Sequence, residues 1–491
     1  MKKQTVLDQP PLLFFVVMIV IVIGTSLALV LSLQGSEGPM EELMGEMPVF
    51  SFSRLGDETL LFERLCPCSR ILIPATNERE ISNTVFNQGP GESIPDPRGL
   101  STWVWVILQF LDHDITLTES DSTLPRMSIH FNDQIMMHLM QKQTVTDPVG
   151  CKLAKNFISV AVDGTNIYGD YRDPEHAKSL RTGVLGQMKV NSKGFLPRNP
   201  ENPNEFLAGD KRSTEHALLA LMHTLFVREH NRIAKEMHEM MPTWSDDQLY
   251  WKALQVNVAQ YQRILYEEVL PALFGEQAYK KYVVGASSKV LGAGMTVASE
   301  FSNTAFRFGH SMVANNVGRF PLKDLFFNAD FLENTGLETL ILEAQKTPSQ
   351  QVDTKVVNGL RNILFGNFGE DLVTRNLFRA RELEVSTYQQ LADCYGFPSD
   401  PLPENTDGLV GLLSEPLMEG SSLPRGLATI VGEQLQRSFS QDPHFYKSSK
   451  AQIGSHFYKQ VESTTFRDIV VRNTALTEQQ LPANMFFMTA K

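Results

Sequence analysis

The sequence predicts a mostly α-helical protein, in which one large domain follows an N-terminal hydrophobic helix. Apolar residues recur at helical spacing, whereas the strict alternation typical of a half-buried strand is scarce. The 491 residues show no internal repeat and no second break in composition after the N-terminal part. We therefore expect a tail over 1–11, a transmembrane signal-anchor over 12–33, a linker over 34–50 and one domain over 51–491.

The N-terminal hydrophobic segment runs from Leu12 to Leu33 without a charged residue, which is long enough to cross a bilayer as a helix. Two lysines precede the segment and four glutamates follow it. Because positive flanks stay in the cytosol, we expect a cytosolic N-terminus and an extracellular or lumenal domain. If the segment is instead cleaved as a signal peptide, the domain is secreted.

The net charge of −12 argues against a nucleic-acid-binding protein, because such binding needs a basic surface. The four cysteines are fewer per residue than in small scaffolds stapled by disulfides. Cys66 and Cys68 are too close to bridge each other and lack the CxxC spacing of a metal site. Free or partly buried thiols are therefore the favoured interpretation of Cys66, Cys68, Cys151 and Cys394.

Two long helices are predicted in the middle of the chain. One has apolar residues spaced four, three and four apart up to Leu265, and Ser245 with Gln248 forms a capping-box pattern at its start. The other runs from Leu218 towards Met237. Polar, proline-rich segments are expected to be loops, over 194–206 and 397–406.

A cluster of polar residues, from Gln109 to Asp114, follows a strongly apolar run over 103–108. On a helix, Gln109 and His113 stand at i and i+4, and Asp112 lies three residues after Gln109. A functional site and a surface or N-cap cluster both fit this pattern. Charged groups rarely follow such a run without partners or a task.

Two further clusters contain histidines. Arg212 and Glu215 stand at i and i+3 and can face one pocket. His223 and His230 are seven residues apart, so a metal pair is one interpretation, but structural histidines are favoured. His310 follows a glycine among aromatic residues, which allows a flat ligand to approach, although the spacing alone favours a core histidine.

The segment 159–165 offers alternating oxygen atoms from hydroxyl, backbone carbonyl and carboxylate groups. Hard oxygen ligands on a short irregular loop suit Ca²⁺. A polar turn without a metal is the alternative interpretation.

These clusters are best interpreted together, from the order in which they occur along the chain. The motifs are LQFLDHDITLT, SVAVDGTNIYGD, FLAGDKRSTE, EFSNTAFRFGHSM and DLVTRNLFRARE. Over roughly residues 70–485 this order resembles the animal-type haem peroxidase family of the peroxidase–cyclooxygenase superfamily. The resemblance implies a helical domain that holds a haem b derivative and uses hydrogen peroxide to oxidise phenolic or aromatic donors, or halides, through a ferryl intermediate.

The resemblance implies a role for each motif residue near the haem. His113 matches the distal histidine that moves a proton between the oxygens of the peroxide, and Arg212 the arginine that stabilises the developing negative charge. Gln109 matches the glutamine that hydrogen-bonds water and substrate. His310 matches the proximal iron ligand, and Asn376 accepts its other N–H.

The resemblance also implies covalent bonds to the haem, arginines beside it and a calcium site. Asp112 and Glu215 match the carboxylates that form ester bonds to the haem, and Arg307 and Arg379 match arginines beside it. One family member adds a Met sulfonium link directly after the glutamate, but this chain has His216 there, so no such link is expected. The calcium ligands implied by the resemblance are Asp114, Ser159, Ala161, Asp163 and Thr165.

Two sequence features bear on the choice between possible functions. Where the family usually reads Arg-Gly-Arg-Asp-His-Gly, this chain has a different run from Arg379 to Glu384. Fatty-acid dioxygenases resembling cyclooxygenases place a radical-forming Tyr three residues before the proximal histidine, and this chain has Arg307 there. The alternatives to a peroxidase are therefore such a dioxygenase or a catalytically weak, membrane-anchored adhesion or scaffold protein, and the sequence leaves the oligomeric state open.

Overall fold

The computed structural model describes residues 60–69, 77–89, 92–131, 134–285, 292 and 294–488. The predicted tail, signal-anchor and linker, over 1–11, 12–33 and 34–50, lie outside the described residues. Among the described residues, no helix is both long and apolar enough to cross a membrane.

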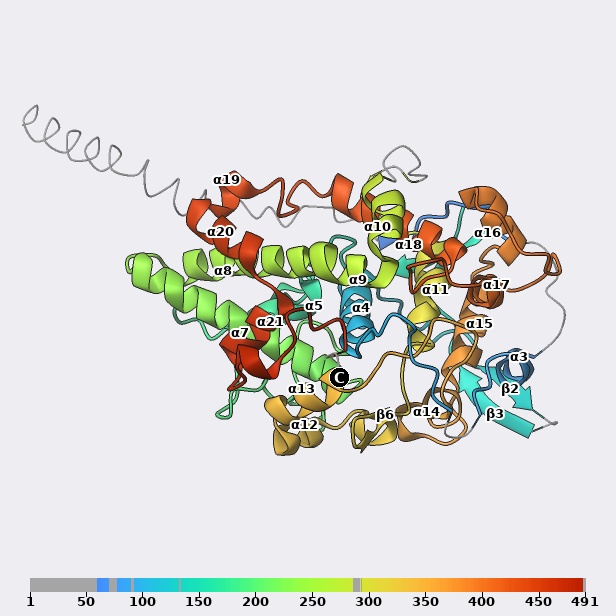
Figure 1. Ribbon diagram of the computed structural model, residues 1–491, viewed down its shortest axis with the longest axis horizontal. Coiled ribbons are helices and arrows are strands. Elements are labelled where there is room, and N and C mark those ends of the chain that lie inside the picture. The colour runs from blue at the N-terminus through green and yellow to red at the C-terminus, as the bar shows by residue number, and fades with distance from the viewer. Residues whose placement is uncertain are drawn as a thin grey trace, which may run out of the picture.

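Helices make up most of the secondary structure, which confirms the predicted fold class for this part of the chain. The long helices α7 (Ala217–Met240) and α8 (Asp246–Ile264) pack side by side, and α4 (Trp103–Ile115) packs on α7 in the middle of the body (Figure 1). The other α-helices are α3 (Glu78–Thr84), α5 (Thr165–Tyr168), α6 (Pro174–Ser179), α9 (Leu270–Phe274), α10 (Glu276–Tyr282), α11 (Ser299–Asn303), α12 (Ala329–Thr335), α13 (Leu337–Gln345), α14 (Asn358–Arg361), α15 (Leu372–Glu382), α16 (Tyr388–Tyr395), α17 (Gly408–Ser414), α18 (Arg425–Gln441), α19 (Lys450–Ile453), α20 (Ser455–Ser463) and α21 (Phe466–Asn473).

Shorter helical turns and three small antiparallel sheets complete the fold. A π-helical turn, η1 (Leu265–Val269), extends α8. The 3₁₀ helices are η3 (Ala305–His310), η4 (Leu322–Leu325), η5 (Leu364–Gly366) and η6 (Glu478–Gln480). The sheets have the strand orders β1-β5-β4, β2-β3 and β6-β7, from β1 (Leu60–Leu61), β2 (Met127–Phe131), β3 (Gln134–Leu139), β4 (Thr144–Thr146), β5 (Lys152–Asn156), β6 (Asn316–Val317) and β7 (Phe320–Pro321).

The predictions for the two long helices are confirmed. Ser245 and Gln248 form the capping box that starts α8, and α7 covers the apolar stretch from Leu218 to Met237. Both proline-rich segments are loops without a helix or strand. Phe110 of α4 stacks on Phe226 of α7, with ring centroids 5.4 Å apart, so the core joins the central helix to the long pair.

The prediction of free thiols is wrong, because all four cysteines form disulfides. Cys66 pairs with Cys394, and Cys68 pairs with Cys151, with Cα–Cα distances of 5.7 and 5.9 Å. Sequence spacing tested only the pairing of the two neighbouring cysteines. Their actual partners are 328 and 83 residues away and are brought close by the tertiary fold.

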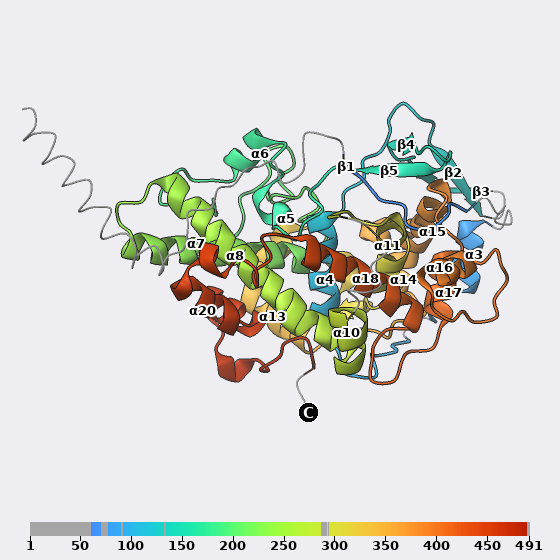
Figure 2. The ribbon, with the colours of Figure 1, turned by 90° about the horizontal axis from the view of Figure 1, so that it is seen from above.

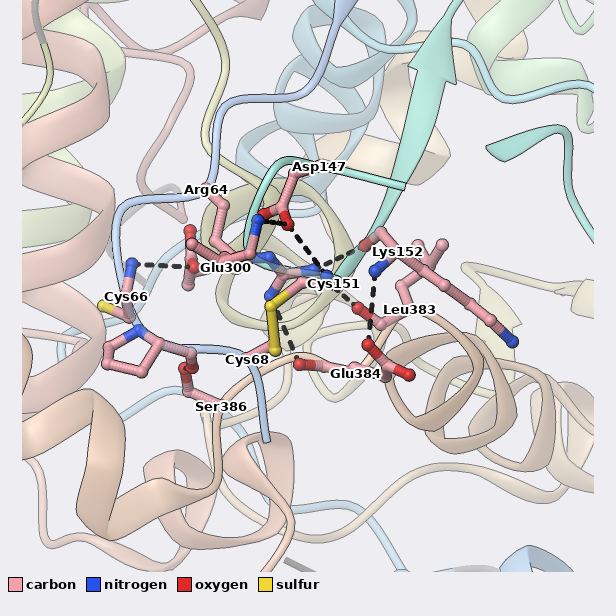
Figure 3. The surroundings of a disulfide bond; sticks show 12 residues. Arg64, Cys66, Cys68, Asp147, Cys151, Lys152, Glu300, Leu383, Glu384 and Ser386 are labelled. Atoms are coloured by element: carbon pink, nitrogen blue, oxygen red, sulfur yellow. Dashed lines mark hydrogen bonds between the residues drawn. A yellow bond between two sulfur atoms is a disulfide. The ribbon is translucent and has the colours of Figure 1, made fainter. Parts of the chain in front are cut away.

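The disulfides fix the chain around residues 60–69 beside the C-terminal end of α15. Figure 3 shows Arg64 reaching from this segment to three backbone carbonyls. Its guanidinium donates to the carbonyls of Lys152 and Leu383 at 2.6 and 2.7 Å, and to that of Glu384 at 3.2 Å. Arg64 therefore satisfies carbonyls that the end of the helix leaves open.

Candidate active site

A cavity of about 320 Å³ lies where α4, the turn before α7, η3 and α15 meet. A volume of this size is within the range of small-molecule and cofactor sites. The predicted residues that line this cavity are Gln109, Asp112, His113, Arg212, Glu215, Arg307, His310, Asn376 and Arg379. The structure thus brings together residues from four separate motifs.

Helix α4 supplies Gln109, Asp112 and His113 to one side of the cavity. Every residue of α4 except Gln109 is buried, so the helix cannot rotate without breaking the core on its other faces. The spacing of the three residues therefore places an amide, a carboxylate and an imidazole along one wall, as the helical pattern predicts.

Arg212 is held on the same side by several contacts. It makes a bidentate pair with Asp210 at 2.9 and 2.7 Å, and donates to the Thr116 carbonyl at 2.8 Å. The charge of Asp210 raises the pKa of Arg212 despite the opposing effect of burial, and Arg212 in turn lowers the pKa of Asp210. The guanidinium is therefore a fixed positive charge at the cavity wall.

His113 is almost fully enclosed, at 3% exposure. Burial is the largest cause that lowers its pKa well below the ordinary value, and the positive charge of Arg212 adds to it. Its Nδ1 is 4.0 Å from Asp210 and its Nε2 is 3.6 Å from Glu215 Oε2. Because the imidazole is neutral at neutral pH, these contacts are not ion pairs, and the ring is ready to accept a proton.

Gln109 links the next two residues of the wall. Its amide donates to Glu215 Oε2 at 3.0 Å, and its oxygen lies 2.8 Å from His216 Nε2. Burial is the main cause that raises the pKa of Glu215 to about 7 and lowers that of His216 to about 3. His216 also caps α7 by accepting from the Leu219 N–H, so the position after the glutamate has a structural task.

His310 lines the same cavity from the end of η3. Its Nδ1 is 2.7 Å from Asn376 Oδ1, which leaves Nε2 as the ring nitrogen that can bind a ligand. Burial lowers the pKa of His310 to about 4, so the ring is neutral, as a metal ligand must be. Asn376 comes from α15, so the position of that helix decides the orientation of the imidazole.

Both ends of α15 are anchored. Asp371 caps its N-terminus by accepting from Val373 N at 2.9 Å, and also pairs with buried Arg79 of α3 at 2.5 Å. Arg64 binds the carbonyls at the other end. These contacts hold Asn376 in place through the helix that carries it.

Two arginines join the sides of the cavity. Arg307 of η3 donates to the Ser302 carbonyl at 2.8 Å and lies 3.4 Å from Asp112 of α4. Arg379 of α15 donates to Thr118 Oγ1 at 3.1 Å. The two guanidinium groups therefore tie segments that are far apart in sequence.

The predicted calcium residues form a second cluster behind α4, outside the cavity lining. Asp114 accepts from the N–H groups of Gly164 and Asn166 at 3.3 and 3.4 Å. Asp163 accepts from Ser159 Oγ at 2.7 Å and from Thr165 N at 3.1 Å. Burial and the nearby charge of Asp163 raise the pKa of Asp114 well above its ordinary value.

His223 and His230 do not form a metal pair in the structure. His230 lies 3.1 Å from the Tyr168 hydroxyl and 2.8 Å from the Gly186 carbonyl, so both of its nitrogens have protein partners. His223 packs edge-on against Phe110 at 4.8 Å. Among the described residues, the single group with metal-binding spacing contains the bonded pair Cys68–Cys151, so it is not a metal site.

The buried His223 predicts a pH-dependent stability. Burial lowers its pKa from 6.5 to about 4, so the unfolded chain binds this proton first, and stability falls as pH drops below about 6.5. Between pH 7.5 and 5 the cost is about 2 kcal/mol. The free energy of unfolding of His223→Phe, relative to that of the unmodified protein, should therefore be about 2 kcal/mol higher at pH 5 than at pH 7.5. Urea unfolding at both pH values measures this difference. An equal difference at both pH values contradicts the prediction.

Sequence reasoning missed three charged residues of this region. Arg375 of α15 lines the cavity one position before the predicted Asn376. Asp210 orients Arg212 from two positions earlier, a local signal that the motif itself contained. Lys142 lines the cavity from a segment after β3, far from every motif, and no sequence signal marked it.

The fold and site define a helical protein whose cavity is lined by a ligand-ready histidine, a second neutral histidine and a fixed arginine, and this set of groups suits a haem. The animal haem peroxidase family matches residues 69–402, and the chain belongs to that family. Haem is therefore the cofactor that the family implies.

Individual relatives agree with this assignment. Peroxinectin A of Dictyostelium discoideum is 28% identical, with 81% of this chain and 85% of that protein covered. Lactoperoxidase of Mesocricetus auratus is also 28% identical, but the chain covers 54% of its length. Among solved structures, peroxidase A of D. discoideum has a TM-score of 0.73 at 25% identity, covering 87% and 96% of the two chains.

A fatty acid α-dioxygenase from Oryza sativa is similar in fold, with a TM-score of 0.71 at 17% identity over 84% of this chain and 80% of that one. At this identity the likeness concerns the fold alone. The choice between peroxidase and dioxygenase chemistry therefore rests on the residues of the cavity.

Proposed function

We propose that the protein is a haem peroxidase that uses hydrogen peroxide to oxidise phenolic or aromatic donors, or halides. The observation that carries this proposal is that His310, oriented by Asn376, lines one cavity together with His113 and Arg212. A scaffold protein has no need for this arrangement. Arg307 stands where the dioxygenases resembling cyclooxygenases need an oxidisable Tyr, which disfavours the second activity.

The residues divide the work as follows. When bound, the haem supplies the iron that takes up the oxidising equivalents of the peroxide and releases them to donors. His310 would hold that iron through Nε2, while Asn376 accepts its Nδ1–H and so fixes the tautomer. Neutral His113 accepts a proton from one peroxide oxygen and returns it to the leaving oxygen, which departs as water.

Arg212 stabilises the negative charge that develops during the reaction. Its positive charge lowers the energy of the negative oxygen that develops as the O–O bond breaks, and the Asp210 pair keeps the guanidinium from moving. Gln109, bound to Glu215 and His216, is positioned to hydrogen-bond water or peroxide beside His113. Two donor molecules each give one electron and one proton, so one peroxide yields two waters and two donor radicals.

Asp112 and Glu215 are the proposed attachment points of the haem. Both carboxylates line the cavity, one on α4 and one before α7. Burial raises the pKa of Glu215 to about 7, so part of this carboxyl is still ionised near neutrality, and its carboxylate oxygen would be the nucleophile that forms the ester to a haem methyl group oxidised by peroxide. Acid extraction that leaves the haem with the protein, after reaction with peroxide, supports this link.

A calcium ion at Asp114, Ser159, Ala161, Asp163 and Thr165 is proposed from the repulsion between two close carboxylates and the oxygen-rich loop. We expect chelation to lower the melting temperature by roughly 2–5 °C, because a bound ion stabilises the folded state. Added Ca²⁺ should restore it, and Asp163→Asn should not respond to chelation. An equal response in that variant contradicts the site.

The cellular location is proposed from two features. Two disulfides support an oxidising compartment for the domain. Residues 12–33 are the proposed membrane anchor, with a cytosolic N-terminus, and a secreted domain is the alternative.

One experiment tests the proposed function. The full chain is titrated with haemin while the Soret band is recorded, and hydrogen peroxide with a chromogenic phenol is then added. A Soret band and peroxide-dependent colour support the enzyme. Haem binding without turnover supports the scaffold alternative, and oxygen uptake with a polyunsaturated fatty acid supports the dioxygenase.

A further inference from the structure

The cavity wall carries more positive than negative side chains, although the whole chain has a net charge of −12. The acidic side chains that line it are Asp112 and Glu215. The cationic side chains that line it are Lys142, Arg212, Arg307, Arg375 and Arg379. The excess of cations is therefore local to this cavity and does not reflect the overall composition.

Four of the cationic groups have a carboxylate partner in the protein. The pairs, with their N–O distances, are Arg212–Asp210 at 2.7 Å, Arg307–Asp112 at 3.4 Å, Arg379–Glu382 at 3.3 Å and Arg375–Glu370, the last a very close contact. The remaining cation is Lys142, which lies beside Arg379, since both donate to Thr118.

The ammonium of Lys142 contacts a neutral group. Its Nζ donates to the Thr118 carbonyl at 3.2 Å, and within the described residues no carboxylate lies at ion-pair distance from it. Glu382 is close, but its Oε1 accepts the backbone N–H of Lys142 at 2.7 Å, and its Oε2 lies 3.3 Å from Arg379 Nε. One carboxylate is thus shared between a backbone group and an arginine.

The electrostatics agree with this geometry. Burial, followed by repulsion from Arg379, lowers the pKa of Lys142 to about 7. Burial also lowers the pKa of Arg379 to about 10; attraction to Glu382 opposes this shift, and repulsion from Arg307 and Arg375 adds to it. The nearby carboxylates Glu119 and Glu382 oppose the shift of Lys142, but its pKa stays below the ordinary value. An anion at this end of the cavity removes the repulsion.

We propose that Lys142, together with Arg379, binds a carboxylate at the Thr118 end of the cavity. This proposal rests on the proposed function, because the carboxylate belongs either to a propionate group of the haem or to the reducing substrate. An ammonium and a guanidinium around one site suit a carboxylate, which accepts several charge-assisted hydrogen bonds. The shared chemistry is carboxylate binding, and the two sources give different results below.

The haem is tested first, without any turnover. The full chain and the variant Lys142→Met are titrated with haemin and with haemin dimethyl ester, in which both carboxylates are masked, and affinity is read from the Soret band. If a propionate binds Lys142, the variant loses about tenfold or more in affinity for haemin, and little for the ester.

The substrate is tested next, by steady-state kinetics with 4-hydroxyphenylacetate and with neutral 4-methylphenol. If the donor supplies the carboxylate, haemin binding is unchanged, and Lys142→Met raises KM about tenfold for the anionic phenol alone. The variant Lys142→Arg keeps the positive charge. It should therefore retain the preference for haemin over its ester, or for the anionic over the neutral phenol, in whichever experiment Lys142→Met loses it. Lys152→Met removes an exposed lysine of β5 and serves as the matched control.

The proposal is overturned if Lys142→Met behaves like Lys152→Met in both arms. It is also overturned if the variant weakens haemin and its ester equally, since that identifies a structural role. Failure of the proposed function looks different, because the unmodified chain would then fail to bind haemin or to oxidise either phenol.

Discussion

His113→Ala is expected to retain the haem Soret band but to react with hydrogen peroxide about 10²–10⁴ times more slowly. The haem remains because the proposed iron ligand is His310, and its contact with Asn376 does not involve His113. The reaction slows because the other two histidines of the described cavity lining are engaged elsewhere. His216 contacts Gln109 and caps α7, and His310 contacts Asn376 and is the proposed iron ligand. Stopped-flow absorbance at the Soret band measures the rate.

A control and a pH profile sharpen this test. The control variant His456→Ala removes a half-buried histidine whose partner, Glu236, is distant in sequence. This variant should leave the rate unchanged. In the unmodified protein the rate should stay constant as the pH falls through about 6.5, because burial and Arg212 lower the pKa of His113 below that value. Unaltered peroxide reactivity in His113→Ala, or a decline centred near pH 6.5, contradicts the assignment.

Removing the Cys68–Cys151 bond is expected to destabilise the folded domain by up to about 4–5 kcal/mol. The estimate follows from the 83-residue separation of the two cysteines, which the bond closes into a loop in the unfolded chain. It is an upper value, because Cys66–Cys394 already restricts the same region. Urea unfolding of the variant Cys68→Ala/Cys151→Ala, compared with the unmodified chain, measures the loss.

Thiol titration provides the control for this experiment. All four cysteines of the chain are bonded, so denatured but unreduced protein should react with no thiol reagent. The double variant should also show none, because its two remaining cysteines pair with each other. Free thiols in the unmodified protein, or coincident unfolding curves, contradict the disulfide pattern.

Local sequence pattern predicted the helical elements well. Helix α8 follows from its capping box and apolar spacing, and the common face of Gln109 and His113 follows from a helical repeat of 3.6 residues. The polar residues from 109 to 114 also divide between two sites, since Asp114 points to the loop over 159–165 and not to the cavity. Periodicity alone does not separate these two faces without the packing of α4.

Long-range contacts were predicted only through the family resemblance, or not at all. Arg212 and His113 are 99 residues apart, and nothing local in either motif requires that they meet. Lys142 carries no motif, and its importance appears only when Thr118 and Arg379 are brought beside it. The cysteine prediction failed for the same reason, since disulfide partners depend on distances in the folded chain.

The contact between Glu384 and β5 is a further long-range contact that the sequence pattern did not predict. Glu384 has a φ of 52°, a left-handed conformation in which the family's usual glycine costs less. Its carboxylate accepts from Lys152 N at 3.2 Å, and its carbonyl accepts from Arg64. These bonds offset the backbone strain, so the departure from the family motif is accommodated by the segment that the disulfides hold (Figure 3). Figure 2 shows β1 of that segment beside β5.

The bond between Cys66 and Cys394 has a consequence for biosynthesis. A ribosome must polymerise 328 further residues after Cys66 before its partner exists. During that interval the thiol of Cys66 sits beside Cys68, whose own partner is made much earlier. Cys151 therefore emerges first and can be captured by either of the two neighbours, so maturation requires an isomerase or a reshuffling step whenever the wrong one reacts.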